Sequence, residues 1–333
     1  MSRSAVIGAG SWGTALANLL ALKGDEVVLW AFEPEVASEV NRRHRNDVFL
    51  PEAPLAPALT ATNDLAAALR GASLVVSAVP SHVVRAVLCR AAPALEPNAI
   101  VVSASKGLEP ESLKRMTEVL AEVLPPGTGI AALSGPTFAR EVYERQPTAC
   151  AAASADPEVA RRAQAAMSSG TFRVYTNDDV VGVELAGALK NVIAIAAGIA
   201  EGLGLGHNPR AALITRGLAE ITRLGLGLGA RPQTFAGLAG IGDLVLTCTG
   251  HLSRNRSLGV ELGKGASLAD VQARRLSVAE GVGTARTAVA LGERHGVELP
   301  VCREVARVLF EGKSARRAVA DLMERALTSE VRP

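Results

Sequence analysis

The chain has little net charge, few cysteines and few histidines, and each shortage argues against a class of function. Its 35 lysines and arginines nearly balance 33 aspartates and glutamates, which leaves a formal net charge of +2. Because these charges are interspersed, we expect no nucleic-acid partner. The four cysteines lie far apart without a CxxC pair, and His207 and His251 have no second histidine at ligand spacing. The sequence therefore predicts neither a disulfide framework nor a metal site.

Long hydrophobic runs are also missing. The apolar stretch at 192–200 is much shorter than the roughly 20 residues that cross a bilayer, and Lys190 and Glu201 flank it. Arg3 precedes only a short apolar run that glycines interrupt, which does not fit a secretory signal. No fixed-period repeat stands out. We expect no membrane partner, a location in the reducing cytoplasm, and small molecules as ligands.

The sequence does contain a glycine turn between a short apolar strand and a helix. The run Ala5–Ile7 leads into Gly8-Ala9-Gly10-Ser11-Trp12-Gly13, and a helical pattern follows. Glycines at this spacing allow a tight turn, close approach of a pyrophosphate to the backbone, and close packing of helix on strand. A second strand, expected at 26–30, ends near Glu33, about 20 residues beyond the turn, where an acid can bind a ribose. This context predicts dinucleotide binding, and a glycine loop without a ligand is the alternative.

Strands and helices continue to alternate in the first half of the chain. After a helical stretch at 34–43, apolar runs at 74–79 and 98–103 are typical of buried parallel strands. A helix is expected from Glu109 to about Leu124. Further strands are expected at 130–133, 148–153 and 171–176.

Beyond about Val180 the pattern changes to helices rich in alanine and leucine, with glycine-rich loops expected at 202–206 and 225–229. A chain of 333 residues also exceeds the size at which one core usually stops growing. We predict an α/β Rossmann-type doubly wound sheet in a dinucleotide-binding domain at residues 1–178. An all-helical substrate and catalytic domain is predicted at residues 179–333.

Polar residues follow two of the predicted strands, at the edge of the sheet where a ligand crevice is expected. Lys106 follows the strand at 98–103, where it either meets a substrate oxygen or phosphate or is a solvated loop lysine. The segment Ser134-Gly135-Pro136-Thr137 follows the strand at 130–133. It either presents backbone N–H groups to a ligand or makes a turn.

Lys190 lies in an apolar helical segment, 185–193, with apolar neighbours on nearly every face. Burial lowers the pKa of a lysine, and such a lysine can act as the general acid in carbonyl reduction. A lysine that extends to solvent at a helix edge is the alternative. Asn191 either orients a substrate hydroxyl or caps a local polar group. Asp243 either pairs with Lys190 or caps a helix, and these two roles are compatible.

A polar cluster follows the next apolar helix and consists of Thr247, Ser253, Arg254, Asn255 and Arg256. Arginine is well shaped to bind a phosphate through two hydrogen bonds. The cluster therefore predicts a phosphate site, and a solvated basic loop is the competing interpretation.

These motifs together resemble the bacterial NAD(P)-dependent glycerol-3-phosphate dehydrogenase family over nearly the whole chain. Beyond the glycine turn, the likeness rests on the segments at 102–107, 134–137, 187–191, 240–244 and 253–255. The resemblance implies reversible reduction of dihydroxyacetone phosphate to sn-glycerol 3-phosphate for glycerophospholipid synthesis. It also implies NAD as cofactor, with NADP as an alternative, and a cytoplasmic homodimer.

The resemblance further implies roles for single residues. Lys190 exchanges the proton at the substrate oxygen, and Lys106 and Asp243 complete the catalytic group. The cofactor-binding positions correspond to Gly8, Gly10, Ser11, Trp12, Gly13, Phe32, Glu33, Lys106, Ala139, Arg254, Val278 and Glu280. The substrate-binding positions correspond to Lys106, Gly135, Thr137, Lys190, Asn191, Asp243, Thr247, Ser253, Arg254 and Asn255. Many bacterial members carry His or Arg where this chain has Phe32-Glu33, and this departure predicts a preference for NAD.

Two other functions stay open on sequence alone. A β-hydroxyacid or ketopantoate dehydrogenase would place a lysine on a second-domain helix in the same way, but its substrate offers a carboxylate, whereas Arg254 suits a phosphate. A non-catalytic NAD sensor would keep the fold without turnover, and the intact set of Lys190, Lys106 and Asp243 argues against it.

Overall fold

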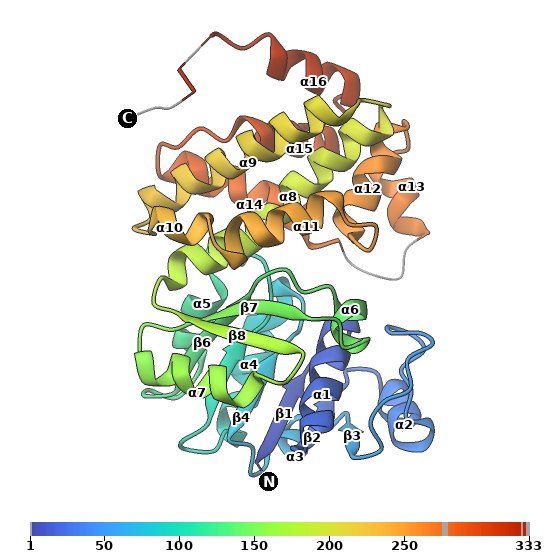
Figure 1. Ribbon diagram of the computed structural model, residues 1–333, viewed down its shortest axis with the longest axis vertical. Helices are drawn as coiled ribbons and strands as arrows, with labels where there is room; N and C mark the ends of the chain where they lie inside the picture. The colour runs from blue at the N-terminus through green and yellow to red at the C-terminus, as the bar shows by residue number, and fades with distance from the viewer. Residues whose placement is uncertain (1, 275–278, 328, 331–333) are drawn as a thin grey trace.

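The computed structural model describes residues 2–274, 279–327 and 329–330. Figure 1 shows an α/β half built around one sheet and, packed on it, a half made of helices from α8 onward. The strands are β1 (Arg3–Ile7), β2 (Glu26–Trp30), β3 (Leu59–Thr62), β4 (Leu74–Ser77), β5 (Ile100–Ser103), β6 (Gly129–Ser134), β7 (Thr148–Ala153) and β8 (Phe172–Asn177).

These strands form a single sheet in the order β3-β2-β1-β4-β5-β6-β7-β8. The order reverses between β1 and β4, so the carboxyl ends of these two strands border the crevice where ligands bind in such sheets. Neighbouring strands pair in parallel except β6 and β7, which are antiparallel. The predicted doubly wound sheet is confirmed, with one reversed strand pair that the sequence did not indicate.

Helices cover both faces of the sheet and enclose two apolar cores. The first half contains α1 (Ser11–Lys23), α2 (Pro34–Arg43), α3 (Leu65–Leu69), α4 (Val84–Ala91), α5 (Met116–Val123), α6 (Ala139–Tyr143) and α7 (Pro157–Met167). Buried side chains of α1, α2, α6 and α7 share a core with one face of the sheet, and those of α3, α4 and α5 share a second core with the other face. The sheet is therefore buried on both sides, as its continuously apolar strands predict.

A third core lies inside the helical half, around α8. The helices are α8 (Val180–Gly202), α9 (His207–Gly227), α10 (Pro232–Phe235), α11 (Asp243–Thr249), α12 (Arg254–Gly263), α13 (Leu268–Ala273), α14 (Glu280–Arg294), α15 (Pro300–Phe310) and α16 (Ala315–Met323). Helix α8 supplies much of this core, and α9, α11, α12 and α14 pack against it. The predicted all-helical second half is confirmed. The division at residue 178 stays a prediction, although β8 ends at Asn177 and α8 begins at Val180.

Helix α8 is longer than the apolar stretch at 192–200 indicated. With 23 residues it is long and apolar enough to cross a membrane, and 89% of its most apolar window is buried inside the protein. Among the described residues, the only other segment of this kind is a bent pair of helices, 232–249 and 254–263, counted as one span. The burial of α8, rather than a short length, makes it a core helix.

The strands expected at 74–79 and 98–103 are shorter than predicted, at 74–77 and 100–103, and two other predicted boundaries are wrong by more. The helix expected from Glu109 begins only at Met116, because Leu113 adopts a left-handed backbone conformation (φ 63°) and Leu108 forms a β-bridge with Arg115. The loop expected at 225–229 is in part helical, since α9 continues to Gly227. There the aromatic ring of Phe235 lies where a side chain at Gly225 would be, so a glycine within the helix allows close packing.

Candidate active site

The centre of the candidate site is one carboxylate held between two lysines. Asp243 Oδ1 accepts a hydrogen bond from Lys190 Nζ at 2.6 Å, and its Oδ2 accepts one from Lys106 Nζ at 2.7 Å. Lys106 follows β5 in the sheet half, whereas Lys190 and Asp243 belong to α8 and α11 of the helical half. The cluster thus lies where the two halves meet, beside the carboxyl ends of the strands.

Further polar groups fix both ammonium groups. Lys106 also donates to the carbonyl of Gly135 at 2.9 Å and to Thr137 Oγ1 at 3.2 Å. Lys190 donates to Thr247 Oγ1 at 2.7 Å, and that hydroxyl lies one helical turn beyond Asp243. The structure therefore brings together six predicted residues of the proton-transfer and substrate sites, from two strand-end loops and two helices.

The environment of Lys190 determines its proton affinity. The residue is only 6% exposed, so the alternative of a lysine extending to solvent is wrong. Burial lowers the pKa of Lys190 to about 8, with the neighbouring charge of Lys106 acting in the same direction and Asp243 opposing it. A lysine with this pKa can give and take a proton near neutral pH.

Asp243 does not cap a helix through its side chain. It is the first residue of α11, Gly242 occupies the N-cap position, and no side chain caps that end. The carboxylate is committed to the two lysines and to Thr247, whose hydroxyl lies 3.2 Å from Oδ1. Of the two roles that the sequence left open for Asp243, the structure supports the pairing with Lys190.

Asn191 and Asn255 form a second polar unit beside the lysines. Asn255 Nδ2 donates to Asn191 Oδ1 at 2.9 Å, and Asn255 Oδ1 accepts from the backbone N–H of Gly281 at 3.0 Å. Both side chains are buried. This chain of hydrogen bonds joins α8, α12 and the start of α14, so it holds Glu280 next to the candidate site.

The polar cluster at 253–256 separates into distinct roles. Ser253 is the N-cap of α12 and accepts from the backbone N–H of Arg256 at 3.2 Å. Arg256 binds Glu201 through two hydrogen bonds, at 2.9 and 2.6 Å, and so serves the packing of α12 rather than the site. Arg254 is exposed at the first position of α12 and lies within electrostatic range of Glu280. Burial raises the pKa of Glu280 to about 7 against the opposing effects of Arg254, Lys190 and Lys106.

The glycine turn fits a dinucleotide in three respects. Gly8 has φ 112°, which favours glycine, and a Cβ at Gly13 would lie 1.8 Å from the Gly8 carbonyl oxygen, so neither position accepts a side chain. A Cβ at Gly10 would meet no other described atom within 4 Å, so the backbone there faces open space. No side chain caps the N-terminus of α1, which leaves its first N–H groups for a phosphate.

Three of the remaining cofactor positions lie after β2 and at the start of α6. Phe32 and Glu33 follow β2, and Phe32 is 72% exposed. Ala139 begins α6, which packs against α1. In the sheet, β1 and β4 lie between β2 and β5, so Phe32 and Glu33 are separated from Lys106. Val278 lies outside the described residues.

Comparisons with known proteins identify the family of this chain. A family model for the NAD-dependent glycerol-3-phosphate dehydrogenase N-terminus matches residues 3–160, and the model for the C-terminus matches residues 179–320. The chain belongs to this family. It is 58% identical to a glycerol-3-phosphate dehydrogenase (NAD(P)+) of Geobacter sulfurreducens over 98% of each chain. It is also 56% identical to one of Citrifermentans bemidjiense over 98% of each. A solved glycerol-3-phosphate dehydrogenase structure from Coxiella burnetii is 41% identical, with a TM-score of 0.93 over 97% of this chain and 99% of the other.

Several residues of this family member were not anticipated from its sequence. Two buried cysteines flank the lysines, Cys150 near Lys106 and Cys248 near Lys190, and burial raises the pKa of each thiol to about 12. Both side chains are fully buried, and at neutral pH both are unreactive thiols. Among the described residues, no group of three or more His, Cys, Asp or Glu side chains is placed to hold a metal ion.

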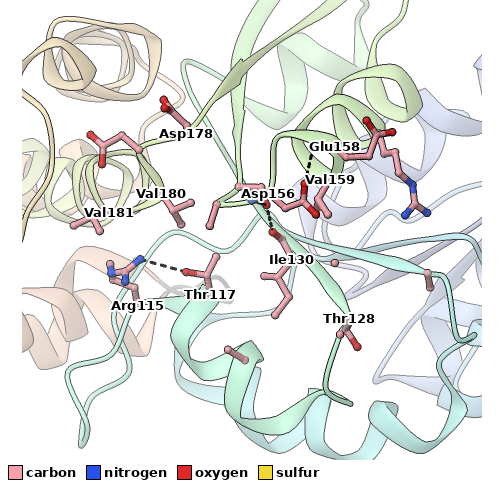
Figure 2. Close-up of a pocket in the computed structure, with 18 of the residues that line it drawn as sticks. Arg115, Thr117, Thr128, Ile130, Asp156, Glu158, Val159, Asp178, Val180 and Val181 are labelled. Atoms are coloured by element: carbon pink, nitrogen blue, oxygen red, sulfur yellow. Dashed lines mark hydrogen bonds between the residues drawn. The ribbon is translucent and has the colours of Figure 1, made fainter.

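A separate cavity of about 840 Å³ lies away from the lysine cluster. Figure 2 shows Arg115 and Thr117 from the start of α5 and Asp156, Glu158 and Val159 from the start of α7 lining it. Arg115 Nη1 donates to Glu184 of α8 at 2.8 Å, and the backbone N–H of Thr117 donates to the same carboxylate at 2.8 Å. The cavity walls thus contain a polar connection between the two halves, and none of the described candidate residues lines it.

Proposed function

We propose that the protein reduces dihydroxyacetone phosphate reversibly to sn-glycerol 3-phosphate with NADH or NADPH, using Lys190 as the proton donor. The observation that carries these roles is the Asp243 carboxylate shared by Lys190 and Lys106. Such an arrangement keeps one ammonium desolvated beside a fixed counter-charge, which is what a general acid near neutral pH needs. The enzyme is thus an oxidoreductase that supplies a building block of glycerophospholipids.

The residues of the site divide the work. Lys190 gives its proton to the ketone oxygen as negative charge develops there, and Asp243 and Thr247 hold the ammonium in the required direction. When bound, the reduced nicotinamide would supply the hydride for the carbonyl carbon. Lys106 adds positive charge near the same oxygen or the phosphate, and its own position is fixed by Gly135 and Thr137. No covalent bond between enzyme and substrate is required.

The substrate phosphate would be bound at the start of α12. Arg254 offers a guanidinium there, and the positive end of the helix dipole at the start of α12 also favours an anion. Binding the phosphate places the carbonyl close to Lys190, so the energy of a remote contact serves orientation at the reacting atoms. Asn191 and Asn255, with their fixed amide orientations, are suited to the substrate hydroxyl and to the phosphate.

The cofactor would extend from the glycine turn to the lysine cluster. Its pyrophosphate would lie against Gly10, Ser11 and Trp12, and its adenosine ribose near Glu33. Glu280, with its pKa raised to about 7, and Ala139 complete this side. We further propose a homodimer in the cytoplasm. The family resemblance supports the dimer, and the four free cysteines are typical of a reducing compartment.

An assay of NADH oxidation tests the function directly. Purified protein should oxidise NADH on addition of dihydroxyacetone phosphate and should reduce NAD with sn-glycerol 3-phosphate. Ketopantoate and a β-ketoacid should give less than about 1% of that rate, because a lost charge-assisted phosphate contact costs several kcal/mol. Faster turnover of a carboxylate substrate would contradict the substrate assignment. Binding of NADH without turnover of any of these ketones would indicate a sensor instead. Sedimentation analysis tests the dimer independently.

A further inference from the structure

The loop at residues 44–57, between α2 and β3, is bound to the back of the glycine turn through Asn46. This residue is 0% exposed. Its Nδ2 donates to the carbonyl of Ala9 at 2.8 Å and to Thr14 Oγ1 at 2.8 Å, and its Oδ1 accepts from the backbone N–H of Phe49 at 3.2 Å. Both ends of the buried amide are therefore used, one toward the turn and one toward its own loop.

Other contacts hold the 44–57 loop in place. Ser11, the first residue of α1, donates from its Oγ to the carbonyl of Phe49. Asn18 Oδ1 accepts from the backbone N–H of Ala56 at 2.8 Å. From α6, Arg140 donates to the carbonyl of Pro51 at 2.7 Å, and Tyr143 donates to that of Pro54 at 2.9 Å. The loop is thus a fixed support behind the turn, and Asn46 is its direct contact with the turn's own carbonyl.

The contact at Ala9 determines which way the next N–H group points. In a trans peptide the C=O of one residue and the N–H of the next point in opposite directions within one plane. No cis peptide is present among the described residues. Because Asn46 and Thr14 Oγ1, which lies 3.1 Å from Ala9 O, hold the Ala9 carbonyl inward, the N–H of Gly10 points outward. A side chain built on Gly10 would meet no described atom within 4 Å, so open space adjoins this peptide.

From this geometry we infer that Asn46 is a positioning residue of the dinucleotide site, which fixes the peptide between Ala9 and Gly10 for the cofactor pyrophosphate. The inference rests on the proposed use of a nicotinamide cofactor. Asparagine suits the position because it supplies two N–H donors and one acceptor without charge. An ionised aspartate of nearly the same shape has no donor and places a negative charge behind a site for phosphates.

The decisive comparison is between Asn46→Asp and Asn18→Asp. Asn18 is a matched control. It is a buried asparagine on α1, the helix that follows the turn, and it accepts a hydrogen bond from the same loop but makes none with Ala9. Its Oδ1 acts as an acceptor, and an aspartate can keep that role. Folding is checked by circular dichroism, NADH affinity by nicotinamide fluorescence in the absence of substrate, and steady-state kinetics give kcat and both KM values.

We expect Asn46→Asp to raise the Kd and KM for NADH by about tenfold or more. The variant loses the hydrogen bond to the Ala9 carbonyl, and its carboxylate repels the cofactor phosphates. Its kcat and its KM for dihydroxyacetone phosphate should stay within about threefold of the parent, since the lysine cluster is untouched. Asn18→Asp should change the Kd for NADH by less than about threefold, even where it lowers Tm. A merely structural role for Asn46 predicts a lowered Tm with an unchanged Kd.

An unchanged Kd in folded Asn46→Asp, or an equal rise in both variants, would overturn the inference. If Asn46→Asp does not fold, Thr14→Val decides, because it removes the Thr14 hydroxyl, the second donor to the Ala9 carbonyl, with little change of volume. It should raise the Kd for NADH by a smaller factor, and an unchanged Kd there also overturns the inference. Wild-type protein that binds NADH but does not reduce dihydroxyacetone phosphate would contradict the proposed reaction, while the comparison at Asn46 would still stand.

Discussion

At the residue scale, the chemistry of the site depends on partners that are far apart in the chain. Lys190 and Asp243 are 53 residues apart, and Lys106 and Asp243 are 137 apart. The sequence pattern identified an apolar helix with one lysine in it, and so predicted a buried lysine. It left the role of Asp243 open, because local sequence does not distinguish a helix cap from a distant ion pair. Tertiary packing decides between the two.

We expect Lys190→Met to keep the fold and NADH binding while the rate of hydride transfer falls by about 10²–10⁴-fold, because methionine fills a similar volume but has no proton to give. Single-turnover reduction of dihydroxyacetone phosphate by prebound NADH measures this rate. The exposed lysine at 264 provides a control, and Lys264→Met should react like the parent. With the pKa of Lys190 at about 8, kcat/KM for reduction should fall as pH rises through that value. A rate within a few-fold of the parent would remove Lys190 from the role of general acid.

Arg254→Ala should raise the KM for dihydroxyacetone phosphate much more than that for NADH. Loss of a charge-assisted contact to a desolvated phosphate costs on the order of 2–5 kcal/mol, so kcat/KM should drop at least about 30-fold. Steady-state kinetics with each substrate varied in turn measure the two effects. Arg316→Ala, an exposed arginine on α16, serves as the control. An unchanged kcat/KM in folded Arg254→Ala protein would place the phosphate elsewhere.

Glu33, three residues beyond the end of β2, should set the choice between NADH and NADPH. Glu33 can accept hydrogen bonds from ribose hydroxyls but repels a 2′-phosphate, so kcat/KM should be higher with NADH than with NADPH. Glu33, the N-cap residue of α2, is tested by Glu33→Gln, which should narrow the NADH-to-NADPH ratio of kcat/KM. Glu35→Gln, in the first turn of α2, should leave that ratio unchanged. Equal values for the two cofactors in the parent protein would show that Glu33 does not face the ribose.

At the scale of elements, sequence patterns predicted most strands and helices and failed where a tertiary contact overrides a local signal. The stretches at 26–30, 34–43 and 148–153 were predicted with the bounds that the structure has. The sequence Glu109-Pro110-Glu111 is a typical helix start, yet Arg85 binds Glu109 at 2.7 and 2.9 Å and the chain turns back before α5. A contact with a residue 24 positions earlier cannot be read from local propensity.

Helix α15 offers a prediction about stability. Its N-terminus is bound by Glu220 of α9, which accepts from the backbone N–H groups of Val301 at 2.7 Å and Cys302 at 3.3 Å. Burial raises the pKa of Glu220 to about 7 from 4.5, despite these hydrogen bonds. The folded state therefore holds the proton more tightly than the unfolded state. The stability that this proton contributes is fully present below pH 4.5 and is lost as pH rises through about 7.

We expect Glu220→Gln, which has no proton to lose, to gain stability relative to the parent as pH rises from 5 to 7, by on the order of 2–3 kcal/mol. Urea unfolding at several pH values gives the difference in free energy of unfolding. Glu293→Gln, an exposed glutamate on α14, should run parallel to the parent. If Glu220→Gln also runs parallel to the parent, Glu220 does not hold a proton in the folded protein.

At the scale of the whole molecule, the reaction needs both halves, but their cores are separate. The two cores on the faces of the sheet contain only residues from Ala5 to Val174. The core around α8 consists of helical-half residues apart from Leu108, with Leu113 packed against it. The halves are joined by ion pairs, from Lys106 to Asp243 and from Arg115 to Glu184, and by a small apolar cluster of Ala132, Ala153, Val183 and Ala239. Composition and alternation predicted the two halves, whereas the ion pairs between them follow only from the fold.

This separation predicts that residues 1–178 fold on their own. The fragment keeps both cores of the sheet. It would expose a small apolar surface around Ala132 and Ala153, which pack against Val183 and Ala239, together with Leu108 and Leu113. It should unfold cooperatively and bind NADH through the glycine turn and Glu33, but more weakly than the full chain because Glu280 and Arg254 are missing. It should not reduce dihydroxyacetone phosphate, since Lys190 and Asp243 are absent. Calorimetry, nicotinamide fluorescence and the oxidation assay measure these three properties. A fragment without a cooperative transition would show that the helical half is needed for the sheet to fold, and the division at residue 178 would then separate functions rather than independent folding units.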